Sequence, residues 1–303
     1  MRQFTRRQFI QTTLASAGLL ATSPISLGAA EAAASAHFKG TDLVSLGQTG
    51  LKVTRLAQGT GYNGYNHSSE QTRQGKEAFD RLARHSLDQG ITFFDMADLY
   101  GSHPFVKEVI KGLPRDRFTL LSKIWPRKEN WVTPSGGAQE EVDRFRKELG
   151  TDWLDVCLIH CMQNANWPSE YERIRDDLSR LKQQKIVRAV GVSCHDFGAL
   201  KVASEHPWVD VIFARINHRG GSKHSCDGSV EEVSAVLKTA RANGKAVVGM
   251  KIFAAGKFAK QPEEKDASLK YVFANRLVDA ITIGMLTPDE VDDTLKRMST
   301  VKA

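Results

Sequence analysis

Four side chains with complementary acid–base chemistry follow one another along the chain: Asp95, Tyr100, Lys123 and His160. A free phenol is a weak acid, with a pKa of about 10. An ammonium group beside a phenol favours the phenolate, and a carboxylate keeps that ammonium charged. A neighbouring imidazole can donate a hydrogen bond to an oxygen and orient it. Together these groups suit the transfer of a proton to an oxygen that is gaining negative charge.

Each of these residues also has a purely structural interpretation. Asp95 and Lys123 are able to form an ion pair that only closes a strand end. In this interpretation His160 is a hydrogen-bonded interior histidine, and Tyr100 is a packed turn residue before Gly101. The catalytic interpretation therefore requires a fold that brings their strands side by side.

The elements that must position these residues alternate between strand and helix patterns from residue 43 onward. Residues 43–53 predict a β-hairpin with its turn at Gly47–Gly50. Eight apolar runs predict strands over 55–59, 92–95, 119–123, 155–160, 189–193, 211–216, 246–251 and 280–283. Amphipathic spacing predicts helices over 71–89, 137–149, 169–184 and 230–243, and a further one that begins at Thr287-Pro288.

Strands that alternate with helices predict parallel pairing, with the helices outside. A single (β/α)8 TIM barrel, preceded by the hairpin, accounts for residues 37–303. An open doubly wound sheet is the alternative, but the glycine-rich residues 59–64 lead into a polar loop instead of opening a helix. In a barrel, chemistry gathers at the C-terminal ends of the strands. The predicted barrel therefore brings the four acid–base residues to one mouth.

The same segments resemble the aldo/keto reductase family from about residue 43 to 298. LGQTGLKVTRLAQGTGY is similar to the family's opening hairpin and first strand. GITFFDMADLYG contains Asp95 and Tyr100, LLSKIWP contains Lys123, and LDVCLIH contains His160. The resemblance implies NAD(P)H-dependent reduction of an aldehyde or ketone, with no metal. It makes Tyr100 the proton donor, tuned by Lys123 and Asp95, and His160 the residue that orients the substrate.

The resemblance also implies a binding site for NADP(H), with NAD(H) as the other possibility. VRAVGVSCHDF is similar to the strand whose Ser193 would hold the nicotinamide carboxamide. The residues that we expect to bind the cofactor are Gly59, Thr60, Ser193, Lys251, Phe253, Gly256, Lys257 and Gly284.

The chain departs from the family at three positions of this site. Cys194 stands where the family usually has Asn, and Phe213 where it usually has Gln. Lys251 stands where the family has an aromatic residue that stacks on the nicotinamide. A lysine does not stack in that way, and Phe253 is the nearest replacement.

The segment after the last predicted strand also differs from the family. The family holds the 2′-phosphate of NADP(H) there with two cations, whereas residues 283–290 contain none and include Asp289 and Glu290. Carboxylates that face a phosphate repel it. We therefore expect a preference for NADPH over NADH below about a hundredfold.

Residues 1–36 have the layout of a removable export signal. Arg6 and Arg7 precede a mild apolar stretch and then small residues, and Ala32 and Ala36 each end an Ala-x-Ala triplet. Paired arginines are typical of twin-arginine export, which carries folded cargo, often with its cofactor inserted. A basic N-terminal arm and an uncleaved anchor are the alternatives. We expect an exported, periplasmic protein that engages the twin-arginine machinery and does not stay inserted in a membrane.

Net charge and cysteine usage limit the other functional classes. The net charge is +7, and the lysines and arginines are scattered among acidic residues, which does not favour nucleic-acid binding. Four cysteines are too few for a disulfide scaffold, although a Cys161–Cys194 bridge stays open. Two other functions are weighed: a nicotinamide-binding sensor or docking module, and a metal-dependent barrel enzyme. The metal would use His160, Cys161, Cys194, His195, His218, His224 and Cys226.

Overall fold

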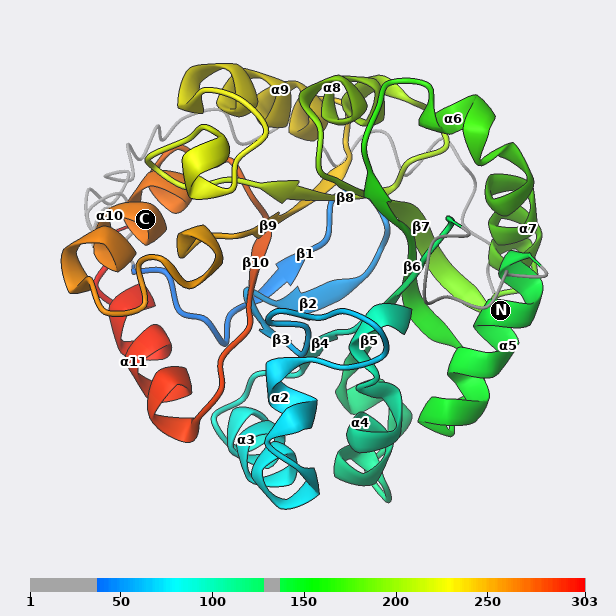
Figure 1. The fold of residues 1–303 in the computed structure, drawn as a ribbon, viewed down its shortest axis with the longest axis horizontal. Helices are drawn as coiled ribbons and strands as arrows, with labels where there is room; N and C mark the ends of the chain where they lie inside the picture. The colour runs from blue at the N-terminus through cyan, green and yellow to red at the C-terminus, as the bar shows by residue number, and fades with distance from the viewer. Residues whose placement is uncertain (1–36, 128–136, 303) are drawn as a thin grey trace, which may run out of the picture. The chain divides into compact units, whose positions relative to one another are not determined.

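The computed structural model describes residues 37–127 and 137–302, so the predicted export signal lies outside the described residues. Within them, eight parallel strands form a closed barrel in the order β3 to β10, and β10 pairs back to β3 (Figure 1). Closure confirms the predicted (β/α)8 barrel and excludes the open sheet. The barrel strands are β3 (Leu56–Gly59), β4 (Phe93–Asp95), β5 (Thr119–Ile124), β6 (Leu154–Met162), β7 (Val187–Cys194), β8 (Val211–Arg215), β9 (Ala246–Met250) and β10 (Ala280–Ile283).

Helices form the outer ring of the barrel, as Figure 1 shows. Their apolar faces pack on the outward side chains of the strands in one continuous core. The α-helices are α2 (Glu70–Arg73), α3 (Lys76–Asp88), α4 (His103–Ile110), α5 (Ala138–Leu149), α6 (Trp167–Glu170), α7 (Glu172–Gln183), α8 (Phe197–Glu205), α9 (Val230–Ala242), α10 (Pro262–Ala274) and α11 (Pro288–Met298). Short 3₁₀ turns are η1 (Asp98–Tyr100), η2 (Arg115–Arg117), η3 (Ser222–His224) and η4 (Ala254–Gly256).

The predicted N-terminal hairpin is present as β1 (Leu43–Ser45) and β2 (Lys52–Thr54), paired antiparallel. Leu46, Leu51 and Val53 are buried in the same apolar cluster as the inward side chains of the barrel strands. The hairpin therefore fills one end of the barrel interior, which leaves the C-terminal ends of the strands as the open mouth.

Three predicted elements differ from the structure for local reasons. The helix predicted over 71–89 is divided into α2 and α3 at Gly75, whose φ of 87° is not helical. The helix predicted over 169–184 is divided into α6 and α7 at Tyr171. The strand predicted over 155–160 continues to Met162 because a register shift after Ile159 accommodates Cys161, whose φ is 66°.

The predicted start of the last helix is confirmed. Thr287 caps α11, its side chain accepting a hydrogen bond from the Glu290 amide, and Pro288 is the first helical residue. In the part of the chain that the structure describes, no helix is long and apolar enough to cross a membrane.

Candidate active site

Asp95 and Lys123 form a buried ion pair at the mouth of the barrel. Asp95 ends β4 and Lys123 lies on β5, and these strands are hydrogen-bonded neighbours. The Lys123 ammonium also donates to the Met96 carbonyl at 2.8 Å, and Asp95 accepts a second hydrogen bond, of 2.8 Å, from the Thr282 hydroxyl on β10. Lys123 is 1% exposed and Asp95 6%, so protein groups, and not bulk solvent, surround both charges.

Tyr100 is placed beside this pair by a fixed turn. It ends η1, and Gly101 follows with a φ of 62°; a side chain at Gly101 would collide with the His67 carbonyl. Arg144 on α5 donates to the Asp98 carboxylate at 2.6 Å and so holds the turn from outside. A Cβ at Gly61 would collide with the Tyr100 ring, so the β3–α2 loop lies directly against it. The Lys123 ammonium lies 5.0 Å from the centre of the ring.

His160, on β6, completes the group of four. Its Nε2 atom is 3.5 Å from the Tyr100 hydroxyl, and the Trp125 ring meets its imidazole edge-on at 5.7 Å. Its Nδ1 atom is buried without a hydrogen-bond partner among the described residues. The structure therefore brings Asp95, Tyr100, Lys123 and His160 into one site.

The protonation states of the site follow from burial and from the paired charge. Burial, followed by the charge of Asp95, raises the pKa of Tyr100 well above its ordinary value. This direction differs from the expectation that Lys123 lowers the pKa, because burial of the phenol is the largest effect. Burial and the nearby cations, Lys123 first among them, hold the pKa of His160 well below its ordinary value. At neutral pH the site thus presents a protonated phenol and a neutral imidazole.

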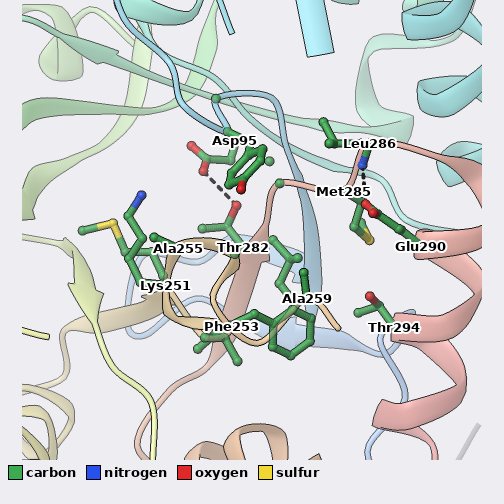
Figure 2. Close-up of a pocket in the computed structure, with 18 of the residues that line it drawn as sticks. Asp95, Lys251, Phe253, Ala255, Ala259, Thr282, Met285, Leu286, Glu290 and Thr294 are labelled. Carbon is green, nitrogen blue, oxygen red and sulfur yellow. Dashed lines mark hydrogen bonds between the residues drawn. The ribbon is translucent and has the colours of Figure 1, made fainter. Parts of the chain in front are cut away.

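A cavity of about 230 Å³ extends from Tyr100 along the end of the barrel. One wall is the segment after β9, from Lys251 to Ala259, and the other is the segment from Thr282 through β10 to α11 (Figure 2). Five of the eight predicted cofactor-binding residues line it: Gly59, Lys251, Phe253, Gly256 and Gly284. Tyr62, Thr282 and Thr294 also line it and were not singled out from the sequence. Glu290, expected to repel a phosphate, lines it together with Met285 and Leu286.

The other three predicted cofactor residues are engaged elsewhere. The Thr60 hydroxyl donates to the Asp95 carbonyl at 2.9 Å, behind the ion pair. The buried Ser193 hydroxyl accepts a 2.8 Å hydrogen bond from the Cys161 amide, next to His160. The Lys257 ammonium donates to the Lys223 carbonyl and does not line the cavity.

The residues that depart from the family pattern have distinct surroundings. Cys194 is buried, and burial raises the pKa of its thiol. Phe213 is buried in the barrel interior with its ring centre 5.1 Å from the Lys123 ammonium. Lys251 lines the cavity directly. The Glu290 carboxylate accepts a 2.7 Å hydrogen bond from the Leu286 amide at the far end of the cavity, the contact drawn in Figure 2.

The thiols and imidazoles near the mouth are separate groups. Cys157, Cys161, Cys194 and Cys226 are all free thiols. Among residues 37–127 and 137–302, no three His, Cys, Asp or Glu side chains are arranged as a metal site. The predicted zinc alternative therefore has no structural support in the described chain.

The sequence matches a known protein family and resembles several characterised proteins. The sequence pattern of the aldo/keto reductase family matches residues 56–270. L-galactose dehydrogenase of Arabidopsis thaliana is 22% identical over 300 residues, which cover 86% of this chain and 89% of that protein. Alignments with further curated relatives cover between 36% and 72% of those proteins.

Solved structures show the same barrel. A Pseudomonas aeruginosa protein described as an aldo-keto reductase superposes with a TM-score of 0.70 at 21% identity, over 87% of this chain and 96% of that one. An aldo-keto reductase from Klebsiella pneumoniae in complex with NADPH gives a TM-score of 0.63 at 19% identity, over 87% and 91%. At these identities the likeness is one of fold.

Proposed function

The chain belongs to the aldo/keto reductase family, and from that premise we propose that it reduces an aldehyde or ketone to an alcohol with NADP(H). The observation that carries the proposal is the position of the Tyr100 hydroxyl. It lies at the cavity, 3.5 Å from the His160 imidazole and beside the buried Lys123–Asp95 pair. A proton donor, a hydrogen-bond donor and a balanced charge are therefore collected where a carbonyl oxygen can enter.

The lining of the cavity supports the binding of a nicotinamide dinucleotide. It runs from Tyr100 to α11, and its walls combine apolar side chains for planar rings with glycine backbone at Gly256 and Gly284. A Cβ at Gly256 would collide with the Tyr62 hydroxyl, so the segment after β9 lies against the β3–α2 loop at that point. Gly59, Phe253, Gly256 and Gly284 would hold the dinucleotide, with Ser193 beside His160. When bound, the reduced nicotinamide supplies the hydride that adds to the carbonyl carbon.

The protein's own groups manage the proton. As hydride adds to the carbon, the C=O π electrons move to oxygen, which takes the proton of the Tyr100 hydroxyl. His160 can donate from Nε2 to the same oxygen and hold it beside the phenol. Because burial raises the pKa of Tyr100, the phenol keeps its proton until the oxygen becomes basic. Lys123, held charged by Asp95, then stabilises the phenolate until solvent returns a proton.

Oxidation of NADPH by a panel of carbonyl compounds tests this function. The dialysed protein, with EDTA present, should oxidise NADPH at the rate at which alcohol forms. Activity that requires an added divalent metal would support the metal-dependent alternative instead. Binding of NADPH without turnover of any aldehyde, ketone or sugar would support the sensor or docking module.

We also propose that residues 1–36 are a twin-arginine signal, removed on export to the periplasm. The support is the sequence alone: Arg6 and Arg7, a short apolar stretch, and Ala-x-Ala triplets that end at Ala32 and Ala36. Because this route carries folded cargo, the barrel would receive its cofactor in the cytoplasm before export.

Replacing both Arg6 and Arg7 with Lys tests the export route. The double variant keeps the charge but should accumulate at full length in the cytoplasm, as cell fractionation and intact mass would show. Lys52→Arg, an exposed substitution in β2, is the matched control and should be processed normally. Processed double variant in the periplasm would contradict the proposal.

A further inference from the structure

Lys251 occupies an unusual position for a lysine. It follows the last residue of β9 with a φ of 59°, in the left-handed region, and it lines the cavity with Tyr100 and Asp95. Left-handed backbone costs a non-glycine residue about 1–2 kcal/mol. In Figure 2 its side chain extends toward the side of the cavity on which the Asp95 carboxylate lies, away from Glu290 and Thr294. The ammonium is therefore presented at the reactive end of the cavity.

The Lys251 ammonium has no acidic partner in the described part of the chain. The carboxylate whose charge reaches it, Asp95, is already bound by Lys123 and by the Thr282 hydroxyl. Arg215, the cation with the largest effect on Lys251, is itself paired with Asp227. Within residues 37–127 and 137–302, the Lys251 ammonium forms neither an ion pair nor a hydrogen bond.

The surroundings of Lys251 add positive charge. Burial first, and then Arg215 and Lys123, lower the pKa of Lys251, while Asp95 acts in the opposite direction. Lys251 and Arg127 in turn lower the pKa of both His160 and His195, so their charges reach the His160 imidazole. Lys251 is half-buried, and an ammonium placed there among cations gains from a ligand that supplies an anion. One unbalanced charge beside Asp95 suits a monoanion better than a dianion.

We propose that Lys251 binds the carboxylate of the substrate, so that the natural substrates are short oxo acids or aldehydo acids. This inference rests on the proposed carbonyl reduction, since it names the group that lies next to the reacting carbonyl. Tyr100 and His160 would contact the carbonyl oxygen, while Lys251, in the segment after β9, would contact the carboxylate. Because Tyr100 and Lys251 line the same cavity, the two groups would lie close together in such a substrate.

A matched pair of substrates tests the inference. Phenylglyoxylate and its methyl ester share the same ketone and differ in the carboxylate charge. Lys251→Met should lower the acid-to-ester ratio of kcat/KM by 10- to 100-fold, and Lys251→Arg should restore part of it. The ratio cancels any general loss of hydride transfer. Lys260→Met, which removes an exposed lysine from the same loop, is the control and should keep the wild-type ratio.

Direct binding provides a readout that does not depend on turnover. Oxamate, an unreactive analogue of a 2-oxo acid, is titrated calorimetrically into the full mature protein with and without saturating NADP⁺. The dissociation constant should rise at least tenfold in Lys251→Met. An unchanged acid-to-ester ratio and an unchanged oxamate affinity would overturn the inference, as would a loss of NADPH affinity with the ratio kept, which would assign Lys251 to the cofactor.

The two proposals fail in different ways. If the wild-type protein oxidises NADPH with neither substrate and with no neutral aldehyde, the proposed reduction is wrong. Oxamate binding that depends on Lys251 would still demonstrate the anion site. If the methyl ester and neutral aldehydes are reduced while the acid gains nothing from Lys251, the reduction stands and the carboxylate site is wrong.

Discussion

Two sides of the barrel mouth differ in how their charges are paired: the β4–β6 side, here called the paired wall, and the β8–β9 side, here called the unpaired wall. On the β4–β6 side, Lys123 is neutralised by Asp95, which is also held by Thr282, so every charge has a fixed partner. On the β8–β9 side, Arg215 has Asp227 but Lys251 has no partner in the described chain. A charge with a protein partner stabilises one arrangement and tunes a neighbour. A charge without one is available to a ligand, which is the basis of the role proposed for Lys251.

Tyr100→Phe should give the largest effect, on the paired wall. The substitution removes only the hydroxyl that lies 3.5 Å from His160. Loss of a general acid typically costs about 10²–10⁴ in rate. We expect kcat for carbonyl reduction to fall in that range while the NADPH dissociation constant, measured by fluorescence, changes little. A kcat close to wild type would remove Tyr100 from the proposed role.

The two walls should also differ in stability. Removing one partner of a buried ion pair leaves the other charge uncompensated, which costs about 3–5 kcal/mol. Asp95→Asn and Lys123→Met should therefore each lower the free energy of unfolding by about that amount. The double variant should lose less than the sum, because no charge stays unpaired. Lys251→Met should be neutral or stabilising. Urea denaturation of the four variants measures this, and a cost of several kcal/mol for Lys251→Met would mean that its charge has a protein partner after all.

His195, beside the cations of the unpaired wall, should make the stability of the protein depend on pH. Burial and the surrounding cations, Arg215 first among them, lower the pKa of His195 to about 3, against 6.5 for an ordinary histidine. Below pH 6.5 His195 therefore binds a proton in the unfolded chain but stays neutral in the folded chain. The free energy of unfolding consequently falls as the pH drops toward 3. From pH 7 to pH 5 this group should contribute a loss of about 1–2 kcal/mol.

The matched measurement is the same denaturation with His195→Gln at both pH values. The variant should lose about 1–2 kcal/mol less than the wild type over this interval, because it lacks the titrating group. Equal losses would show that His195 is protonated in the folded protein.

The smallest expected effect concerns the far end of the cavity. Glu290 accepts a hydrogen bond from the Leu286 amide, and its carboxylate would repel a phosphate placed there. The preference for NADPH over NADH should therefore stay below about a hundredfold, or 2.7 kcal/mol. Glu290→Gln should shift the ratio a few-fold toward NADPH, whereas Asp292→Asn, on the same helix, should not. A thousandfold preference in the wild type, measured by titrating both cofactors, would point to a phosphate site elsewhere.

The barrel and the paired wall were predictable from the sequence because their signals are local. Alternating strand and helix patterns predict the fold, and Asp95, Lys123 and His160 stand at the ends of apolar runs whose order fixes their neighbours. Thr282 could have been found in the same way, since it lies in the last strand, next to the first. Its hydroxyl was overlooked because threonine is an ordinary strand residue.

The lack of a partner for Lys251 could not be predicted, because it depends on which charged side chains the fold brings together. The sequence places Lys251 at a strand end but does not show that Asp227, in the loop after β8, is taken by Arg215. The direction of the Tyr100 pKa was also not predicted, because its main cause is burial of the phenol, which only the folded arrangement shows. The left-handed backbone at Cys161, which extends β6, also has no signal in a residue type that usually avoids it.

The hydrogen bond from Thr282 to Asp95 has a consequence for the evolution of new specificities. It connects the strand that borders the cavity with the carboxylate that pairs with Lys123, so we expect substitutions at these positions to be epistatic. A library that varies Thr282 to change cofactor choice also alters the proton donor's surroundings. Serine, which keeps the hydroxyl, should be accepted alone, while apolar replacements should be recovered only together with compensating changes at Asp95 or Lys123.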